Sequence, residues 1–139
     1  MEKVIEKGRV ILSYRNGVRD SHVSRAVSCR LAAAPQFQAS IVCSSTLASE
    51  IGNSLCKAGA QMGVVWMYDH KKKCYSVSLR SDSDDVNVSL IAKTLGGGGH
   101  PRASGFSYNG ASIEDLLVKT EIGEDKEGPL EKKQRVEAQ

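Results

Sequence analysis

The sequence has few aromatic residues and no long hydrophobic run. It contains two Phe and one Trp among 139 residues, so a core would be built mainly from aliphatic side chains. No apolar stretch reaches the roughly 20 residues of a membrane-spanning helix, and the first seven residues lack the apolar segment of a signal peptide. A content of 40% hydrophobic and 25% charged residues is typical of a soluble globular domain, and this length suits one domain with a real core.

The four cysteines do not form a metal or redox motif. They are Cys29, Cys43, Cys56 and Cys74, and none stands in a Cys-x-x-Cys pair. This spacing argues against a zinc ribbon or a thioredoxin-like site. We expect reduced thiols, and therefore a cytoplasmic or other reducing intracellular compartment.

The formal net charge of +3 is unevenly distributed. Residues 1–120 carry 15 Lys and Arg against 10 Asp and Glu, whereas residues 121–139 carry 4 against 6. The modest net positive charge of residues 1–120 suits a phosphate-bearing partner. The charged segment 121–139 has few apolar residues and is predicted to be a disordered tail.

The most distinctive stretch is a run of four glycines followed by a histidine. Glycine has no Cβ, so its backbone can come close to a ligand, and consecutive N–H groups can form a concave anion site. His100 can donate a hydrogen bond, or a charge when protonated, and Arg102 adds a planar fork of donors. A glycine run alone is more often a flexible loop, but the histidine directly after it favours a cradle for a phosphate or a carboxylate.

Apolar periodicity predicts an α/β domain with a mixed β-sheet flanked by helices. An amphipathic helix is expected over 21–34, after a turn or break at Asn16-Gly17, and residues 2–15 fit a helix or an extended segment equally well. The domain itself reads β-α-β-β-α-β, with a short closing helix at 113–119. Its strands are expected at 38–43, 62–68, 75–80 and 103–108, and its helices at 47–57 and 87–95.

Two polar segments of this domain allow functional interpretations. Arg80 ends a strand, a rigid platform from which it can hold a phosphate bidentately, although an exposed arginine on a solvated face is the plainer reading. The carboxylates of Asp82–Asp85 could suggest a metal site. We interpret them as loop polarity and as caps of the next helix, because negative charge favours a helix N-terminus.

Four segments occur in the order in which one known family has them, within residues 38–108. They are Ser49-Glu50-Ile51-Gly52-Asn53-Ser54-Leu55, Val77-Ser78-Leu79-Arg80-Ser81, Asp85-Val86-Asn87-Val88-Ser89-Leu90-Ile91-Ala92, and Gly96-Gly97-Gly98-Gly99-His100-Pro101-Arg102-Ala103-Ser104-Gly105-Phe106. Together they resemble the DHH-associated C-terminal domain. That domain forms the second half of many DHH-superfamily phosphoesterases, including oligoribonucleases and cyclic-dinucleotide phosphodiesterases. Ser104 departs mildly from the alanine usual in the family.

The resemblance implies a substrate-holding half that closes over a short RNA or a dinucleotide. It implies ligand contacts from Arg80, Gly96, Gly97, Gly98, Gly99, His100, Ala103, Ser104 and Gly105, with Asn53 touching the sugar or base. The family's hydrolysis needs a metal pair, Mn or Mg, held by Asp and His in a catalytic domain. This chain has no Asp-His-His triplet, so we expect no catalytic residue, metal or cofactor here, and no hydrolysis by this chain alone.

The resemblance also implies a division of the chain and a set of partners. Residues 1–36 would be a connector, 37–120 the substrate-binding domain, and a DHH catalytic domain would lie N-terminally or on a separate subunit. A stand-alone nucleic-acid-binding adaptor remains the alternative, favoured slightly by Lys71–Lys73 and Arg102. A third interpretation is that the basic loop at Lys71–Lys73 binds acidic protein surfaces and that the glycine run has only a structural role.

Overall fold

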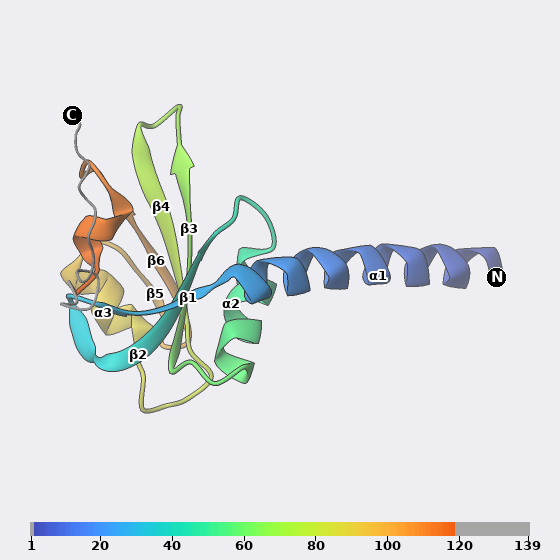
Figure 1. Cartoon of the computed structure of the whole chain (residues 1–139), viewed down its shortest axis with the longest axis horizontal. Coiled ribbons are helices and arrows are strands. Elements are labelled where there is room, and N and C mark those ends of the chain that lie inside the picture. The colour runs from blue at the N-terminus through green and yellow to red at the C-terminus, as the bar shows by residue number, and fades with distance from the viewer. Residues whose placement is uncertain (1, 119–139) are drawn as a thin grey trace, which may run out of the picture.

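A six-stranded mixed sheet forms the body of the protein. The computed structural model describes the backbone of residues 2–118 and the side chains of residues 11–118. The strands lie in the order β1-β2-β3-β4-β6-β5 across the sheet (Figure 1). Their bounds are β1 Val27–Leu31, β2 Ala34–Cys43, β3 Met62–Asp69, β4 Cys74–Arg80, β5 Gly98–His100 and β6 Ala103–Tyr108; the helices are α1 Glu2–Arg25, α2 Ala48–Lys57, α3 Val88–Thr94 and the 3₁₀ helix η1 Ile113–Leu116.

The strand directions follow from the connections. β2 and β3 are parallel, because α2 crosses between them, and every other neighbouring pair is antiparallel. The predicted class, a mixed sheet flanked by helices, is confirmed, and its β-α-β-β-α-β core corresponds to β2-α2-β3-β4-α3-β6. The two edge strands, β1 and β5, were not predicted from the sequence.

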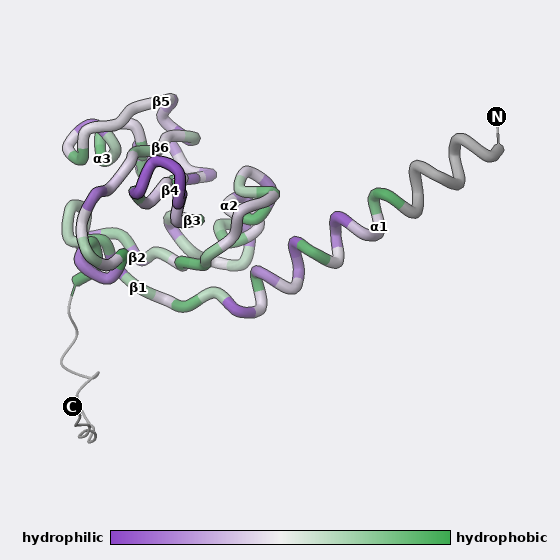
Figure 2. Tube along the Cα trace, turned by 90° about the horizontal axis from the view of Figure 1, so that it is seen from above, coloured by the Kyte–Doolittle hydropathy of each residue, from purple (hydrophilic) through white to green (hydrophobic). Residues whose placement is uncertain are grey.

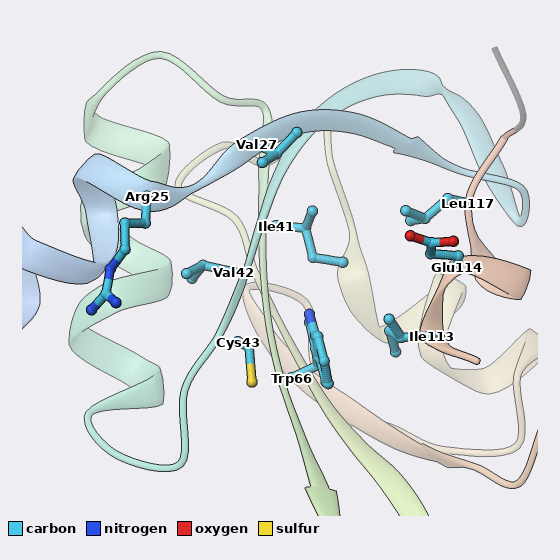
Figure 3. Close-up of a pocket in the computed structure, with 9 residues that line it drawn as sticks. All are labelled: Arg25, Val27, Ile41, Val42, Cys43, Trp66, Ile113, Glu114 and Leu117. Atoms are coloured by element: carbon cyan, nitrogen blue, oxygen red, sulfur yellow. The ribbon is translucent and has the colours of Figure 1, made fainter. Parts of the chain in front are cut away.

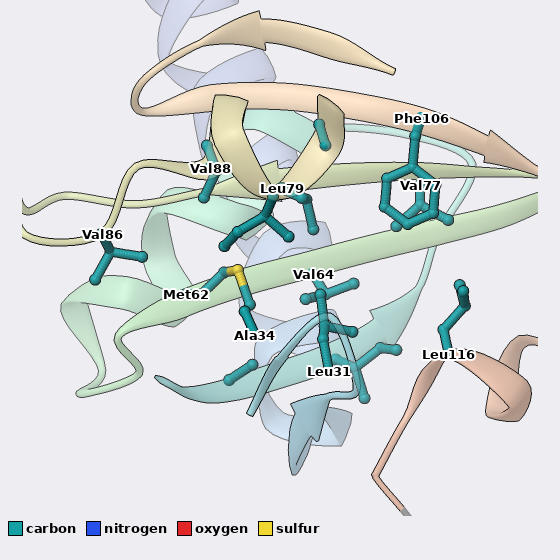
Figure 4. Close-up of a cluster of buried hydrophobic side chains, with 14 of the residues drawn as sticks. Leu31, Ala34, Met62, Val64, Val77, Leu79, Val86, Val88, Phe106 and Leu116 are labelled. Carbon is teal, nitrogen blue, oxygen red and sulfur yellow. The ribbon is translucent and has the colours of Figure 1, made fainter. Parts of the chain in front are cut away.

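The sheet buries two apolar clusters, one on each face. The larger cluster lies under α3 and η1 and includes Leu31, Met62, Leu79 and Phe106 (Figure 4). The smaller one joins α2 to the central strands through Val42, Ile51, Leu55 and Val65. Aliphatic side chains dominate both, as the scarcity of Phe and Trp predicts, and these clusters fix α2 and α3 on opposite faces.

A helix precedes the sheet, but it does not lie at the predicted residues 21–34. α1 runs from Glu2 through Asn16-Gly17 to Arg25 and projects from the sheet (Figure 1). A glycine in an exposed helix costs only about 1 kcal/mol, so Gly17 does not end it. Residues 27–31, placed in the predicted helix over 21–34, instead pair with β2. The alternation of Val27, Cys29 and Leu31 was the overlooked strand pattern.

The C-terminal end differs in type from the prediction. The helix expected at 113–119 is a 3₁₀ turn of four residues, closed by a capping box between Ser112 and Asp115. The disorder predicted for 121–139 lies outside the described residues. None of the described helices combines the length and the apolar composition needed to cross a bilayer.

Candidate functional site

Several of the expected site residues meet on the face of the sheet that carries α2. His100 of β5 stands opposite Ala103 of β6, and Ala103 stands opposite Arg80 of β4. Directly opposed residues of antiparallel strands point to the same face. Arg80 and His100 therefore flank the small Ala103, with their Cα atoms about 10 Å apart, which is two strand spacings. We call these three residues the Arg80–His100 row.

A second row beside it is made of small residues. Gly98 of β5 stands opposite Gly105 of β6, and Gly105 stands opposite Ser78 of β4. None of the three is fully buried. The Arg80–His100 row is therefore bordered by a surface with little side-chain bulk, onto which a flat or extended ligand can settle.

Helix α2 fixes the side chain of Arg80 against the sheet. Arg80 Nη2 donates to Ser49 Oγ at 2.8 Å. The arginine stem lies so close to Gly52 that a Cβ there would collide with Arg80 Cγ, and a Cβ on Gly63 would lie 2.5 Å from the Gly52 carbonyl oxygen. Glycine at both positions thus allows helix and sheet to approach closely, and Arg80 fills the space that remains.

The positive charge of Arg80 has no counter-charge in the described part of the chain. The ion pairs found there are Arg15–Glu50, Arg19–Asp20 and Arg102–Asp84. Arg80 Nε is buried and is the single buried side-chain nitrogen or oxygen atom among the described residues without a hydrogen-bond partner. A buried donor without an acceptor is costly. The site therefore presents an uncompensated cation, which is the chemistry that an anion requires.

Beneath Arg80, a neutral thiol supports the end of β4. Cys56 Sγ donates to the backbone oxygen of Arg80 at 3.4 Å. Burial, and secondarily the negative charge of Asp82, raise the pKa of the Cys56 thiol. The protonated thiol can keep donating at neutral pH, and it adds no negative charge next to the guanidinium.

The glycine run is not the continuous N–H cradle expected from the sequence. The N–H groups of Gly96 and Gly97 donate to Lys93 O and Ala92 O, at 3.2 and 2.8 Å, and close α3 with a Schellman-type cap. These two donors are unavailable to a ligand while the cap is formed. The expected end of the helix at Gly96 is confirmed.

The second half of the run forms the edge strand β5. Gly99 has φ 146°, and a Cβ there would lie 2.7 Å from the carbonyl oxygen of Ala103, so only glycine fits this tight hairpin. Alternate backbone groups of an antiparallel edge strand point away from its neighbour. Any backbone contribution to an anion site must therefore come from Gly98–His100.

The structure places Ser104 on the opposite face from the Arg80–His100 row. The residue is buried, and its Oγ donates to the His100 carbonyl oxygen at 2.6 Å. Ser104 thus holds the β5–β6 turn rather than facing the row. His100 itself is exposed, and its ring has no hydrogen-bond partner among the described residues.

Asn53 lies at the rim of this face. It is exposed on α2, next to Gly52 and one helical turn after Ser49, and residues four apart on a helix share a face. Sequence reasoning missed Ser49, Gly52, Gly63 and Ser78 as members of the site. The spacing of Ser49 and Gly52, within the family-like segment of α2, was the available signal.

The acidic loop 82–85 does not cap α3, so that prediction was wrong. Asn87 is the cap: its side chain accepts from the N–H groups of Ser89 and Leu90. Asp84 instead accepts from Arg102 Nη2 at 2.6 Å. Nowhere in the described part of the chain do three His, Cys, Asp or Glu side chains gather in a way that could hold a metal ion.

One open pocket lies away from all of these residues. It has a volume of about 430 Å³ and lies between β1, β2, β3 and η1, with Trp66 and Ile41 among its lining (Figure 3). None of the expected site residues lines it. Its wall is mostly apolar, so it does not extend the cationic character of the Arg80–His100 row.

Known proteins that resemble the chain include the following three. An uncharacterized protein, R106, of Acanthamoeba polyphaga mimivirus is 31% identical over 123 residues, which are 79% of this chain and 27% of that protein. A pGpG-specific phosphodiesterase from Vibrio cholerae matches with a TM-score of 0.53 and 17% identity, over 78% of this chain and 37% of that one. An uncharacterized protein from Helicobacter pylori G27 matches with a TM-score of 0.49 and 21% identity, over 60% and 22%.

These comparisons concern one part of longer proteins, because the chain spans about a quarter of the length of its viral relative. The likeness to the phosphodiesterase supports the fold described above. A match to the DHHA1 domain extends over residues 36–121, which is more than half of the chain. This match contains α2, α3 and the Arg80–His100 row, and it confirms the resemblance to the DHH-associated C-terminal domain. The chain belongs to the DHHA1 domain family.

Proposed function

We propose that this chain is the substrate-holding half of a DHH-type phosphoesterase and that the Arg80–His100 row binds a phosphate of a short RNA or a dinucleotide. The observation that carries the proposal is the state of Arg80. Its guanidinium is positioned by Ser49 and α2 and has no carboxylate partner among the described residues. Phosphate oxygens accept such charge-assisted hydrogen bonds from arginine in a planar, bidentate geometry.

The rest of the row suits the same ligand. His100 stands on the other side of Ala103, so a phosphate above Ala103 is within reach of both side chains. Gly98, Gly105 and Ser78 leave room for the adjoining sugar, and Asn53 can hydrogen-bond a sugar or base from the rim of α2. Backbone N–H groups of Gly98–His100 that point away from β6 would add donors.

The substrate class comes from the family and from one structural neighbour. That neighbour is a phosphodiesterase specific for pGpG, a dinucleotide with a terminal phosphate. A short 5′-phosphorylated RNA matches the size and the charge of the Arg80–His100 row better than a long duplex does. The four unpaired cysteines fit a reducing compartment such as the cytoplasm.

Hydrolysis of the substrate would need a second, catalytic domain. We propose that a DHH catalytic domain, on a longer form of this protein or on a separate subunit, supplies the Asp and His ligands of a divalent metal such as Mn or Mg. The metal would polarise the phosphate and activate water. This chain's own residues would hold and orient the substrate. The isolated chain is therefore expected to bind a dinucleotide without hydrolysing it.

The test compares two arginine variants of the 139-residue chain by titration calorimetry with 5′-phosphorylated diguanylate RNA. Arg80→Met keeps the aliphatic stem against Gly52 but removes the charge, and we expect a loss of affinity of roughly 10- to 150-fold, the range of a charge-assisted hydrogen bond. Arg102→Met is the matched control, because Arg102 is exposed and pairs with Asp84. Equal affinity of the Arg80→Met variant and the wild type would contradict the proposal.

A stand-alone nucleic-acid-binding adaptor is the second candidate, favoured by the exposed lysines of the β3–β4 hairpin. The two candidates differ in what the Arg80–His100 row does. A chain that is only an adaptor would bind long single strands more tightly than dinucleotides, with a steep loss of affinity with salt, and Arg80→Met would not change its affinity for a 5′-phosphorylated dinucleotide. A substrate-holding half would bind ligands of two to about five nucleotides with a terminal phosphate through this row, and Arg80→Met would weaken that binding.

A further inference from the structure

The β3–β4 hairpin carries a compact aromatic surface that the phosphate site does not use. Tyr68, Tyr75 and Tyr108 stand opposite one another across β3, β4 and β6. Each ring packs against the next: the centroids of Tyr68 and Tyr75 lie 5.1 Å apart, and those of Tyr75 and Tyr108 lie 6.3 Å apart. His70 packs its ring edge-on to Tyr68 at 4.8 Å. Within this row, Tyr68 is the most accessible tyrosine, with 36% of its surface exposed.

The neighbouring rings hold Tyr68 in place. Tyr75 packs edge-on against both Tyr68 and Trp66, and Tyr108 donates its hydroxyl to Asp115 at 3.1 Å. A ring fixed in this way loses little conformational freedom when a planar ligand stacks on it. The tyrosine row therefore offers a rigid platform whose accessible end is Tyr68, beside the tip of the hairpin.

Three lysines stand at that tip. Lys71, Lys72 and Lys73 are exposed and belong to none of the ion pairs among the described residues. The nearest acid in sequence, Asp69, is engaged in holding the turn, because its Oδ1 accepts from the N–H groups of Lys71 and Lys72 at 3.0 and 3.1 Å. The hairpin tip is the deep purple, hydrophilic loop in Figure 2, and Figure 1 shows that it projects from the sheet.

Lys73 occupies a backbone conformation that favours glycine. Its φ is 56°, in the left-handed region, where a residue with a Cβ is strained by about 1–2 kcal/mol relative to glycine. Glycine would close the same turn more easily, so the lysine brings charge to this position at a cost in stability. This allows a substitution that separates binding from folding.

We propose that the β3–β4 hairpin is a second binding surface, for single-stranded nucleic acid: a base stacks on Tyr68, whose ring His70 supports edge-on, and the neighbouring phosphates pair with Lys71–Lys73. Aromatic rings beside cationic side chains are the combination by which proteins bind single strands without reading their sequence. This surface is distinct from the Arg80–His100 row. Tyr75 and Arg80 lie about 17 Å apart along β4, and their side chains leave opposite faces of the sheet. The proposal does not depend on the phosphate site.

The test measures the fluorescence anisotropy of a labelled twelve-nucleotide oligouridylate without a 5′-phosphate, bound to the full chain. We expect Tyr68→Ala to weaken binding about tenfold, within the range of one lost base stack. The triple variant Lys71→Ala, Lys72→Ala, Lys73→Ala should also lower the slope of log affinity against log salt by about 2, at about 0.7 per phosphate contact. Lys93→Ala, an exposed lysine on α3, is the control and should change neither value.

Two further measurements separate an effect on binding from an effect on folding, and the hairpin surface from the phosphate site. Lys73→Gly should weaken binding a few-fold while the melting temperature stays equal or rises, because the left-handed turn becomes unstrained. The dinucleotide titration of Arg80→Met measures the phosphate site separately, so failure here is distinguishable from failure of that site. The proposal is overturned if the Tyr68→Ala and lysine variants bind like the wild type. It is also overturned if poly-glutamate of the same length displaces the RNA as well as RNA itself does, since acidic protein surfaces would then be the better ligand.

Discussion

The contact between Gly52 and Arg80 gives the sharpest prediction about the phosphate site. In Gly52→Ala, the new methyl group would collide with Arg80 Cγ and lie 3.0 Å from Arg80 Cβ. Because these atoms lie at the base of the arginine, the side chain cannot swing only its tip aside. The guanidinium should leave Ser49 Oγ, to which it now donates at 2.8 Å.

The effects on stability and binding should differ in size. Replacing a helical glycine by alanine gains about 1 kcal/mol of helix propensity, whereas overpacking costs about 1–3 kcal/mol. The net loss of unfolding free energy should lie at about 0–2 kcal/mol, or a fall in melting temperature of at most about 8 °C. Affinity for a 5′-phosphorylated RNA dinucleotide should fall by roughly 10- to 150-fold, as in Arg80→Met.

Calorimetric titration and thermal unfolding of the same samples test this pair of effects. Gly17→Ala is the matched control, because Gly17 lies within α1 and a Cβ there meets no atom within 4 Å; this variant should be as stable as the wild type or more so, with unchanged affinity. Ser49→Ala removes the hydroxyl contact without a clash and should weaken binding a few-fold. A folded Gly52→Ala variant with wild-type affinity would refute the role assigned to the position of Arg80.

Three further predictions concern elements around the site. Asn87→Ala removes the side-chain cap of α3 and should lower the unfolding free energy by about 1 kcal/mol, measured by urea denaturation. Ser104→Ala leaves the His100 carbonyl without its 2.6 Å hydroxyl donor; it should cost about 1 kcal/mol and weaken dinucleotide binding, whereas an unchanged affinity would mean that the β5–β6 turn is fixed without Ser104. Burial raises the pKa of the Cys29 thiol from 9.0 to about 11. The folded protein thus holds this proton more tightly than the unfolded chain does, so its contribution to stability should be constant below pH 9 and decline between pH 9 and 11. Cys29→Ala should remove that part of the decline in denaturation curves recorded across this range, and identical curves for variant and wild type would contradict the assignment.

The central elements could be predicted from the sequence because their patterns are local. The near-continuous apolar run of β3, the alternation in β4 and the helical spacing in α2 each occur within ten residues. β1 was missed because Val23, Ala26, Val27 and Leu31 also fit a helical period. Its strand form is decided by pairing with β2 and by burial of Leu31, which is 1% exposed.

The site could be predicted only in part, since its geometry depends on contacts between distant segments. Arg80 and His100 belong to different motifs, and they meet because β6 lies between β4 and β5 in the sheet. Glycines have low strand propensity, so β5 could not be expected from Gly98–His100. The use of the Gly96 and Gly97 N–H groups by α3 is likewise a property of the helix end rather than of the glycine run.

The most direct test of the central claim is an amide chemical-shift titration of the full chain with a 5′-phosphorylated RNA dinucleotide, beside the same dinucleotide without its phosphate and without added metal. The Arg80–His100 row predicts shifts that depend on the phosphate and gather at Arg80, Gly98–His100 and Ala103–Gly105, with Gly96 and Gly97 moving less because they remain bonded to α3. The absence of amide chemical-shift changes at these residues with millimolar ligand would contradict a preformed phosphate site. Equal changes with and without the phosphate on the dinucleotide would contradict it as well.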